Sequence, residues 1–426
     1  MVQEFEKISR IQGELVLPGD KSISHRALIF SAMAKGESRI LNLSNSEDVR
    51  STKECFEALG IEFNGDNKEL IIEGKGLGNF AMPVKPLYSG NSGTTARLMS
   101  GLLVAQNFKS IITGDSSLSQ RPMKRVITPL TAMGGKITCS DNDTLPITIN
   151  PGGKLKAIKY ELPVSSAQIK SAVLIAGLHI DDTTSVIEKV QSRDHTEKML
   201  GLKVEKNEEG IISYSSKKNY PEPKEYFIPS DISTAAFFIV LTLLSENSSL
   251  TLKNISLNET RTGYINVLKK MGGYIKIDNK QEKAGEEFGD IFVKSSKLNN
   301  VKIPEEIIPN MIDEIPVLAI AGIFADGKFE ISNASELRKK ETDRIKAICE
   351  NLKLLDLIVD EYESGFSISG KPKNIKAEFQ SYDDHRIAMA FGILSMLLDR
   401  GGKVNGFRSV KISNPQFLQQ LKKMVN

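Results

Sequence analysis

The chain contains six short polar clusters, and each one runs directly into an apolar stretch of helical length. The clusters are Gly19–Arg26, Gly90–Arg97, Ser165–Lys170, Ser230–Thr234, Ile312–Pro316 and Tyr382–Arg386. Taking Ser22, Ser92, Ser166, Asp231, Glu314 and Asp384 as landmarks, successive clusters lie 65 to 83 residues apart. A repeat near 70 residues indicates one supersecondary unit used six times, and it constrains the fold more than any other feature.

Each repeat predicts helices alternating with short strands, which is an α/β pattern. The expected first helices are Ile23–Ala34, Thr94–Val104, Ile169–Leu178, Thr234–Leu244, Pro316–Phe324 and Arg386–Leu398. The expected strands include Ser38–Leu43, Ser110–Thr113, Thr184–Glu188, Ser249–Leu252 and Lys328–Ser332. The polar segments Asn207–Pro223 and Asn279–Gly289 are predicted to be exposed loops. Three units on each side of a seam near Pro229 would make two similar halves.

The position of the polar clusters at helix starts indicates anion binding. A helix N-terminus offers unpaired N–H groups and a partial positive charge. Several clusters also carry a cation, such as Lys21, Arg26 or Arg386. Six such starts brought together would suit a small, multiply charged anion.

Composition excludes several classes of protein. The chain has 426 residues, 56 basic against 53 acidic, and a net charge of only +3. This balance lacks the long basic stripe of a nucleic-acid-binding protein, so we expect no nucleic-acid partner. No apolar run is long enough to span a membrane and no secretory signal opens the chain, so we expect a cytoplasmic protein without a membrane partner. The three scattered cysteines fit a reducing compartment and argue against both a disulfide framework and a zinc site.

Each motif taken alone also has a plain structural interpretation. Gly19–Arg26 can be a capped helix with solvated charges, with Asp20 or Ser22 as the cap. The loop that carries Arg121 can be an ordinary surface loop, and the charged run Glu336–Arg344 can be a solvated helix face. His385 can shuttle protons or can be a buried structural histidine. Only the combination of motifs favours a binding site.

Six of these segments, in this order, resemble the enolpyruvyl transferase family, and most closely its shikimate branch, the EPSP synthases. The matching segments are Leu17–Leu28, Gly90–Leu98, Gly114–Met123, Ser166–Lys170, Glu336–Ile345 and Asp384–Met389. The resemblance covers nearly the whole chain. It implies a two-domain inside-out barrel of six βαβαββ repeats, three per domain, with the active site in the interdomain cleft. The implied domains are residues 1–15 plus 230–426, and residues 16–229.

The resemblance implies the transfer of the enolpyruvyl group of phosphoenolpyruvate to the 5-hydroxyl of shikimate-3-phosphate, with release of phosphate. Both substrates carry a phosphate and a carboxylate, so the site must hold several anionic groups. By resemblance, the residues that bind shikimate-3-phosphate are Lys21, Ser22, Arg26, Ser166, Ala167, Gln168, Arg193, Asp313 and Lys340. Those that bind phosphoenolpyruvate are Lys21, Gly93, Arg121, Gln168, Arg344 and Arg386.

The same resemblance implies that Lys21, Asp313, Glu341 and Lys340 supply the acid and the base. One group must take the proton of the attacking hydroxyl and another must protonate the methylene carbon, and the roles of the individual carboxylates stay open. This chemistry requires no metal and no organic cofactor. We expect a monomer whose partners are the two small substrates.

Two details qualify the resemblance. Ser166–Lys170, Arg193–Glu197 and Asn258–Arg261 resemble the class II branch, which is associated with tolerance to glyphosate, whereas Gly93 resembles sensitive members, so tolerance stays open. Some members also carry a Lys three residues before a Pro that opens the last helix. Here Ile412 takes that place before Pro415, and Lys411 is therefore left out of the predicted site.

Two alternatives were compared with this interpretation. A sister enzyme that acts on UDP-N-acetylglucosamine carries a reactive Cys in the loop that matches Gly114–Met123, and this chain has none there. A clamp-like nucleic-acid-binding repeat protein would also aim helix starts at phosphates, but it would need the basic stripe that the composition lacks.

Overall fold

The computed structural model describes residues 1–373 and 375–424, which fold into two compact units. Unit 1 comprises Met1–Pro18, Pro229–Gln281 and Glu287–Asn426, and unit 2 comprises Gly19–Ile228 with Glu282–Glu286. The boundary therefore falls at Pro18 and Pro229, and one short segment, Glu282–Glu286, belongs to unit 2 although both of its neighbours belong to unit 1.

Unit 2 has six helices and twelve strands among its described residues. The helices are α1 (Lys21–Met33), α2 (Glu47–Ala58), α3 (Gly93–Leu103), α4 (Lys124–Ala132), α5 (Ala167–Gly177) and α6 (His195–Leu200). The strands are β3 (Lys35–Leu41), β4 (Phe63–Gly65), β5 (Glu69–Lys75), β6 (Leu87–Tyr88), β7 (Ser110–Thr113), β8 (Lys136–Thr138), β9 (Ile147–Asn150), β10 (Lys159–Glu161), β11 (Thr184–Glu188), β12 (Val204–Asn207), β13 (Gly210–Ser215) and β14 (Glu225–Phe227).

Unit 1 carries the remaining elements. Its helices are α7 (Ile232–Leu244), α8 (Gly263–Lys270), α9 (Ile315–Phe324), α10 (Arg344–Lys353), α11 (His385–Leu397) and α12 (Phe417–Met424). Its strands are β1 (Val2–Phe5), β2 (Gln12–Val16), β15 (Ser249–Ser256), β16 (Tyr274–Lys283), β17 (Glu286–Lys294), β18 (Phe329–Ile331), β19 (Ile358–Tyr362), β20 (Gly365–Ser369), β21 (Ala377–Gln380) and β22 (Gly402–Asn405). The tip of the β16–β17 hairpin is the segment assigned to unit 2.

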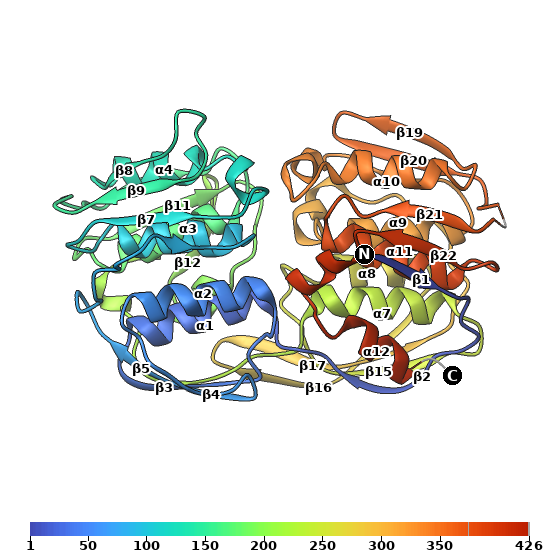
Figure 1. Ribbon diagram of the computed structural model, residues 1–426, viewed down its shortest axis with the longest axis horizontal. Helices are drawn as coiled ribbons and strands as arrows, with labels where there is room; N and C mark the ends of the chain where they lie inside the picture. The colour runs from blue at the N-terminus through green and yellow to red at the C-terminus, as the bar shows by residue number, and fades with distance from the viewer. Residues whose placement is uncertain (374, 425–426) are drawn as a thin grey trace. The chain divides into compact units, whose positions relative to one another are not determined.

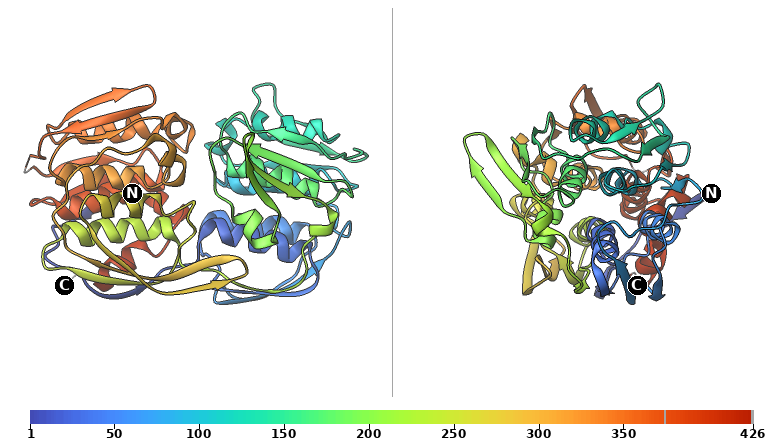
Figure 2. Two further views of the ribbon diagram at one scale, coloured as in Figure 1. Left: turned by 180° about the vertical axis from the view of Figure 1, so that it is seen from behind. Right: turned by 90° about the vertical axis from the view of Figure 1, so that its left-hand side faces the viewer.

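The described strands form six sheets with closely related orders. In unit 2 the orders are β14-β3-β5-β4, β6-β7-β9-β8 and β10-β11-β13-β12. Each of these sheets has one parallel pair followed by two antiparallel pairs. In unit 1 the orders are β16-β17-β15-β2, β18-β20-β19 and β1-β22-β21. Figure 1 and the left view of Figure 2 both show β3 and β5 passing beneath α1 and α2.

Three buried helices form the centre of each unit, and they begin at the six polar clusters of the sequence. In unit 2 they are α1, α3 and α5, and in unit 1 they are α7, α9 and α11. Every residue from Ile315 to Ile323 of α9 is buried, as is every residue from Ile232 to Leu243 of α7. Helices that are apolar on all sides belong in a core. The polar residues therefore stand at the N-terminal ends of the core helices, where anions bind best.

Two predicted loops are corrected by the structure. The segment Asn207–Pro223 contains β13, which pairs with β11 and β12, and the hydroxyl of its buried Ser213 donates to Glu197 Oε1 at 3.0 Å. The segment Asn279–Gly289 is a hairpin that turns at Ala284 and Gly285, both with positive φ. The segment was predicted to be a loop because it is rich in charged side chains. Antiparallel strands with one solvated face can be equally rich in charged side chains, so composition alone does not separate the two.

Among the residues that the structure describes, no helix combines the length and the apolar character needed to cross a bilayer.

Candidate active site

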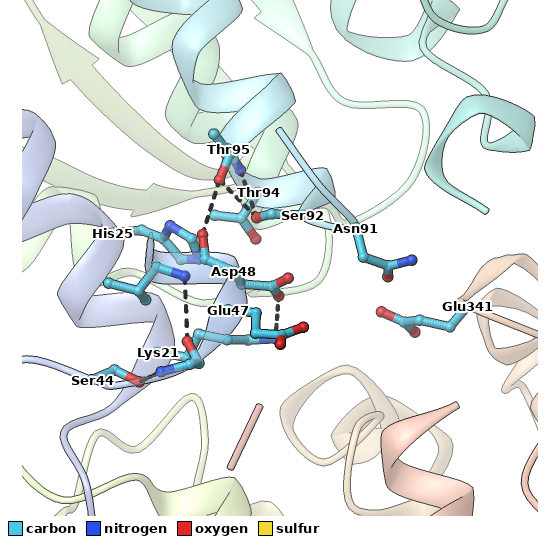
Figure 3. A network of polar contacts seen from close by, with 12 residues as sticks. Lys21, His25, Ser44, Glu47, Asp48, Asn91, Ser92, Thr94, Thr95 and Glu341 are labelled. Atoms are coloured by element: carbon cyan, nitrogen blue, oxygen red, sulfur yellow. Dashed lines mark hydrogen bonds and ion pairs between the residues drawn. The ribbon is translucent and has the colours of Figure 1, made fainter. Parts of the chain in front are cut away.

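The start of α1 places Lys21 beside an acidic partner from α2. Asp20 caps the helix by accepting from the N–H of Ile23 at 3.0 Å. Lys21 Nζ lies 2.7 Å from Asp48 Oδ2, and both side chains are mostly buried, at 18% and 8% exposed (Figure 3). The predicted substrate-binding lysine is thus an ion-paired group held at a helix N-terminus. A ligand anion there would compete with Asp48 for the ammonium.

The start of α3 is organised around Gly93. Ser92 caps the helix through its Oγ, which accepts from Thr95 N–H at 3.1 Å. A Cβ at residue 93 would lie only 2.5 Å from Arg97 Nη1, so glycine here keeps the guanidinium in place. Arg97 Nη1 donates to Gln168 Oε1 at 2.8 Å, and Gln168 Nε2 donates to Thr94 Oγ1 at 2.9 Å. The starts of α3 and α5 are thereby joined by side-chain hydrogen bonds.

Arg121 is held over the same region by the loop before α3. Its Nη2 donates to Asn91 Oδ1 at 2.7 Å and to Ser117 Oγ at 3.3 Å. Asn91 in turn donates to Asp115 Oδ2 at 2.8 Å. The side chain is therefore ordered rather than splayed into solvent, in contrast to the surface-loop alternative.

Arg26 is a buried cation in the middle of unit 2. Its Nε donates to Thr196 Oγ1 at 2.8 Å and its Nη2 to Ser171 Oγ at 2.7 Å. The pKa of Arg26 is lowered to about 10, mainly by burial and also by the nearby charge of Arg193, against the opposing effect of the acidic groups around it. Two cations, Arg26 and Arg193, thus lie close enough to repel, and such a pair favours an anion between or beside them.

A buried ionic cluster supports this region from behind. Lys170 Nζ lies 2.7 Å from Glu188 Oε1 and 2.8 Å from Glu197 Oε1, with all three side chains at 3% exposure or less. Ser192 Oγ donates to Glu188 Oε2 at 2.6 Å. These contacts fix the backbone on both sides of Arg193 and connect it to α5. This helix begins at Ala167, directly after Ser166, and both residues are predicted to bind the ligand.

In unit 1, Asp313 gathers three cations. Lys340 Nζ lies 3.4 Å and Arg344 Nη1 3.1 Å from its Oδ1, and Arg386 Nη2 lies 3.7 Å from its Oδ2. These groups come from the start of α9, the loop before α10, α10 itself and α11. The cluster combines cations that could bind phosphate or carboxylate with a carboxylate that could take up a proton.

Arg344 is the most constrained residue of this cluster. Its side chain is 1% exposed, and it also contacts Asp384 Oδ2 at 2.7 Å and Glu341 Oε2 at 2.7 Å. Burial by itself would lower the pKa of Arg344, but the carboxylates of Asp384, Glu341 and Asp313 outweigh it and raise the pKa above its usual value. The guanidinium is therefore a permanent positive charge.

The charged run Glu336–Arg344 is not one solvated helix face. It forms a short 3₁₀ segment, Ser335–Lys339, followed by a new helix that Asp343 caps through Lys346 N–H at 3.0 Å. Asp343 also pairs with Arg338 at 2.7 Å. Lys340 and Glu341 lie between the 3₁₀ segment and α10, where Lys340 reaches Asp313 and Glu341 reaches Arg344.

The C-terminal cluster is built by Asp384. Its Oδ1 accepts from the N–H of Arg386 at 2.7 Å, and its Oδ2 accepts from Arg344. His385 follows it as a buried residue on α11. Lys411, excluded from the predicted site, is exposed within a 3₁₀ segment that also contains Ile412.

The structure thus gathers the predicted residues into two sets, each within one unit. Unit 2 holds Lys21, Ser22, Arg26, Gly93, Arg121, Ser166, Ala167, Gln168 and Arg193, and unit 1 holds Asp313, Lys340, Glu341, Arg344 and Arg386. Among the described residues, no group of three or more His, Cys, Asp or Glu side chains could hold a metal ion.

Comparison with known proteins identifies the family of this chain. The family model of EPSP synthase (3-phosphoshikimate 1-carboxyvinyltransferase) matches residues 5–421. The chain belongs to the EPSP synthase family. A 3-phosphoshikimate 1-carboxyvinyltransferase of Petrotoga mobilis is 46% identical and covers 99% of both chains. One of Bacillus licheniformis is 41% identical over 98% of both chains.

Solved structures agree with this assignment. The EPSP synthase of Acinetobacter baumannii is 38% identical, with a TM-score of 0.87 over 100% of this chain and 98% of that chain. The enolpyruvyl transferase NikO from Streptomyces tendae shares the fold, with a TM-score of 0.78 at 14% identity. The α/β fold expected from the resemblance is confirmed.

Sequence reasoning missed several residues that the structure of this EPSP synthase family member brings into its candidate site. Asp48 is one, because a counter-ion 27 residues from Lys21 leaves no local signal. Arg97 is another, and its spacing of four residues from Gly93 could have revealed it as a neighbour on the same helix face. Lys170, Glu188 and Glu197 were also missed, since a buried ion pair has the same composition as a solvated one.

Proposed function

We propose that this chain is a 3-phosphoshikimate 1-carboxyvinyltransferase, which joins shikimate-3-phosphate to phosphoenolpyruvate and releases phosphate. The observation that carries the proposal is the pair of cationic clusters at the starts of core helices, one around Lys21, Arg26 and Arg121 and one around Asp313. Curated relatives of that name, 41–46% identical over nearly the whole chain, support it.

The proposed binding roles follow from charge and position. Arg26 and Arg193, with the start of α5, suit the phosphate of shikimate-3-phosphate, while Arg121 and the small residue Gly93 suit phosphoenolpyruvate. Lys21 would contact both substrates. Arg344 and Arg386 would complete the phosphoenolpyruvate site from unit 1, and their charge is now balanced by protein carboxylates that a ligand anion could replace.

The proposed reaction is an addition followed by an elimination. The 5-hydroxyl oxygen bonds to the enol-ether carbon of phosphoenolpyruvate, its proton passes to a base, and an acid protonates the methylene carbon. Loss of phosphate then breaks the carbon–oxygen bond, and a methyl proton returns to a base to restore the double bond. Asp313 and Glu341 are the proposed carboxylates and Lys21 and Lys340 the proposed ammonium groups, because each carboxylate lies against a cation.

We further propose the architecture of six βαβαββ repeats, three in each unit, closed as an inside-out barrel with the two substrates bound by groups from both units. The repeated sequence of one parallel and two antiparallel pairs in the sheets of unit 2 supports it. We also propose a cytoplasmic monomer. The three cysteines, none of which forms a disulfide, support a reducing compartment.

Phosphate release tests the function. We expect release when shikimate-3-phosphate and phosphoenolpyruvate are both present, and none when either is left out. Turnover with UDP-N-acetylglucosamine in place of shikimate-3-phosphate would contradict the proposal. Release from phosphoenolpyruvate alone would indicate a phosphatase instead.

A further inference from the structure

A continuous chain of buried polar side chains joins α1, α2 and α3 behind the candidate site. His25 Nδ1 lies 2.7 Å from Thr52 Oγ1, Thr52 Oγ1 lies 2.7 Å from Thr95 Oγ1, and Thr95 Oγ1 donates to Ser92 Oγ at 2.8 Å. All four residues are buried, at 0% or 1% exposure. Figure 3 shows His25, Ser92 and Thr95 beside Lys21 and Asp48.

Each member of the chain lies directly behind a residue of the candidate site. His25 is four residues after Lys21 on α1, and Thr52 is four residues after Asp48 on α2, so each pair shares a helix face. Ser92 and Thr95 flank Gly93 at the start of α3. Thr95 Oγ1 also lies 3.4 Å from the carbonyl oxygen of Asp48. The chain therefore spans the three helix starts that carry Lys21, Asp48 and Gly93.

Counting hydrogens assigns a direction to the chain. Thr95 Oγ1 has the geometry of a donor toward Ser92 Oγ and the Asp48 carbonyl, and with its single hydrogen directed there it accepts from Thr52. Thr52 has then spent its own hydrogen and must accept from His25. His25 is therefore the tautomer with hydrogen on Nδ1. Its Nε2 has no hydrogen-bond partner, which is consistent, because a buried unpaired N–H is rarer than an unpaired acceptor.

We infer that the chain His25–Thr52–Thr95–Ser92 is a positioning layer for phosphoenolpyruvate, with His25 as the donor that fixes its direction. The inference rests on the proposed function. None of the four side chains needs to touch substrate. The layer holds Lys21, its partner Asp48 and the backbone at Gly93 in register, and small errors in such positioning are costly to ligand binding and turnover.

The threonine in the middle provides the sharpest test. Thr52→Val keeps the shape but removes the hydroxyl, and we expect the KM for phosphoenolpyruvate to rise about 10-fold. The KM for shikimate-3-phosphate should rise less, because Lys21 serves both substrates whereas Gly93 serves phosphoenolpyruvate alone. Thr52→Ser restores the hydroxyl and should restore the KM. Thr242→Val is the matched control, because Thr242 is equally buried but its hydroxyl bonds only to the carbonyl of Phe238 in unit 1.

Substitutions of His25 test the direction. His25→Asn can present an N–H close to the position of Nδ1, so it should keep the KM for phosphoenolpyruvate near that of the wild type. His25→Leu should raise it as Thr52→Val does. In the double variant, His25→Leu should add nothing to the effect of Thr52→Val, since one break already interrupts the chain.

A measurement on the unmodified protein covers the case in which a variant does not fold. Nitrogen-15 NMR of His25 near neutral pH should show hydrogen on Nδ1 and an unprotonated Nε2. Hydrogen on Nε2 would overturn the inference, as would an unchanged KM for phosphoenolpyruvate in folded Thr52→Val or an equal effect of Thr242→Val. Absence of phosphate release by the wild type would overturn the proposed function and this inference together, whereas the other failures leave the function standing.

Discussion

At the scale of single residues, Lys21 carries the proposal most directly. Its ammonium is paired with Asp48 at the start of α1, where a ligand anion would find both a cation and helix N–H groups. Lys21→Met should lower kcat by about 100-fold or more without loss of the fold. Steady-state phosphate release and circular dichroism check both parts. Lys68→Met, at an exposed position, is the control and should retain activity.

Asp313 and Glu341 should behave as groups of the chemical step. Both are carboxylates against cations, and Asp313→Ala and Glu341→Ala should each lower kcat by roughly 10²–10⁴-fold, more than they raise either KM. A rise in KM with unchanged kcat would reassign them to binding. Glu306→Ala removes an exposed carboxylate elsewhere in unit 1 and should leave both constants unchanged.

The buried His25 should make stability depend on pH. Burial, followed by the charges of Lys21 and Arg26, lowers the pKa of His25 well below its usual value of 6.5. The unfolded chain therefore takes up a proton near pH 6.5 while the folded chain does not. Stability contributed in this way is present above that pH and is lost as the pH falls below it, by up to about 1.4 kcal/mol per pH unit for this group.

Chemical denaturation between pH 7.5 and 5 would measure this effect. The free energy of unfolding of the wild type should fall over this range, and His25→Asn should fall less steeply. Thr52→Val changes no ionisable group and should keep the wild-type slope. Equal slopes in the wild type and His25→Asn would contradict the assignment.

At the scale of helices, the packing of α3 against α5 depends on a glycine. A Cβ at Gly101 would lie 2.2 Å from the backbone oxygen of Ala172, so the two helices would have to separate. Gly101→Ala should lower the free energy of unfolding by about 1–3 kcal/mol, although alanine is the better helix former. Because α3 and α5 carry Gly93 and Gln168, activity should fall as well.

A second helical glycine offers the comparison. At Gly392 on α11 the nearest atoms to an added Cβ are Phe ring carbons at 3.1 to 3.4 Å, and these can shift more easily than a backbone carbonyl. Gly392→Ala should therefore be much less destabilising than Gly101→Ala in thermal denaturation. Equal losses would show that close helix packing is not the cause.

The core elements were largely predictable from sequence, for a physical reason. The helices that begin at the polar clusters are apolar on nearly all sides, so α9 was predicted to within one residue, and β7 and β11 were predicted with their observed bounds. The strand β13 was missed because its buried serines carry the composition of a loop, and the hydroxyl of Ser213 is satisfied by a carboxylate 16 residues away, Glu197. The local pattern of polar and apolar residues predicts helices and strands, but it does not predict which distant residues they contact.

At the scale of the whole molecule, the same limit applies to the candidate site. The residues around Asp313 come from three helices and a loop, and no local pattern could bring them together. Their grouping with Lys340, Arg344 and Arg386 needed the folded chain. The family resemblance predicted that these residues belong to the site. The structure adds which carboxylate pairs with each cation.

The division of cations between the units leads to a prediction about the order of binding. Unit 2 carries Lys21, Arg26, Arg121 and Arg193, and unit 1 carries Lys340, Arg344 and Arg386. If shikimate-3-phosphate draws on both sets, it should favour a more compact state, because more cations can then reach the same anion. Binding of the first substrate would thereby prepare the site for phosphoenolpyruvate, and the coupling must be reciprocal.

Solution scattering should show a smaller radius of gyration at saturating shikimate-3-phosphate, but not with shikimate, which lacks the phosphate and serves as the control. Calorimetric titration in the slow Glu341→Ala background should show tighter binding of phosphoenolpyruvate once shikimate-3-phosphate is present, by roughly 5–150-fold. An unchanged radius, together with an affinity for phosphoenolpyruvate that ignores the first substrate, would mean that each unit binds its anions independently. The cations of the two units would then serve separate sites, and the shared site proposed for catalysis would have to be abandoned.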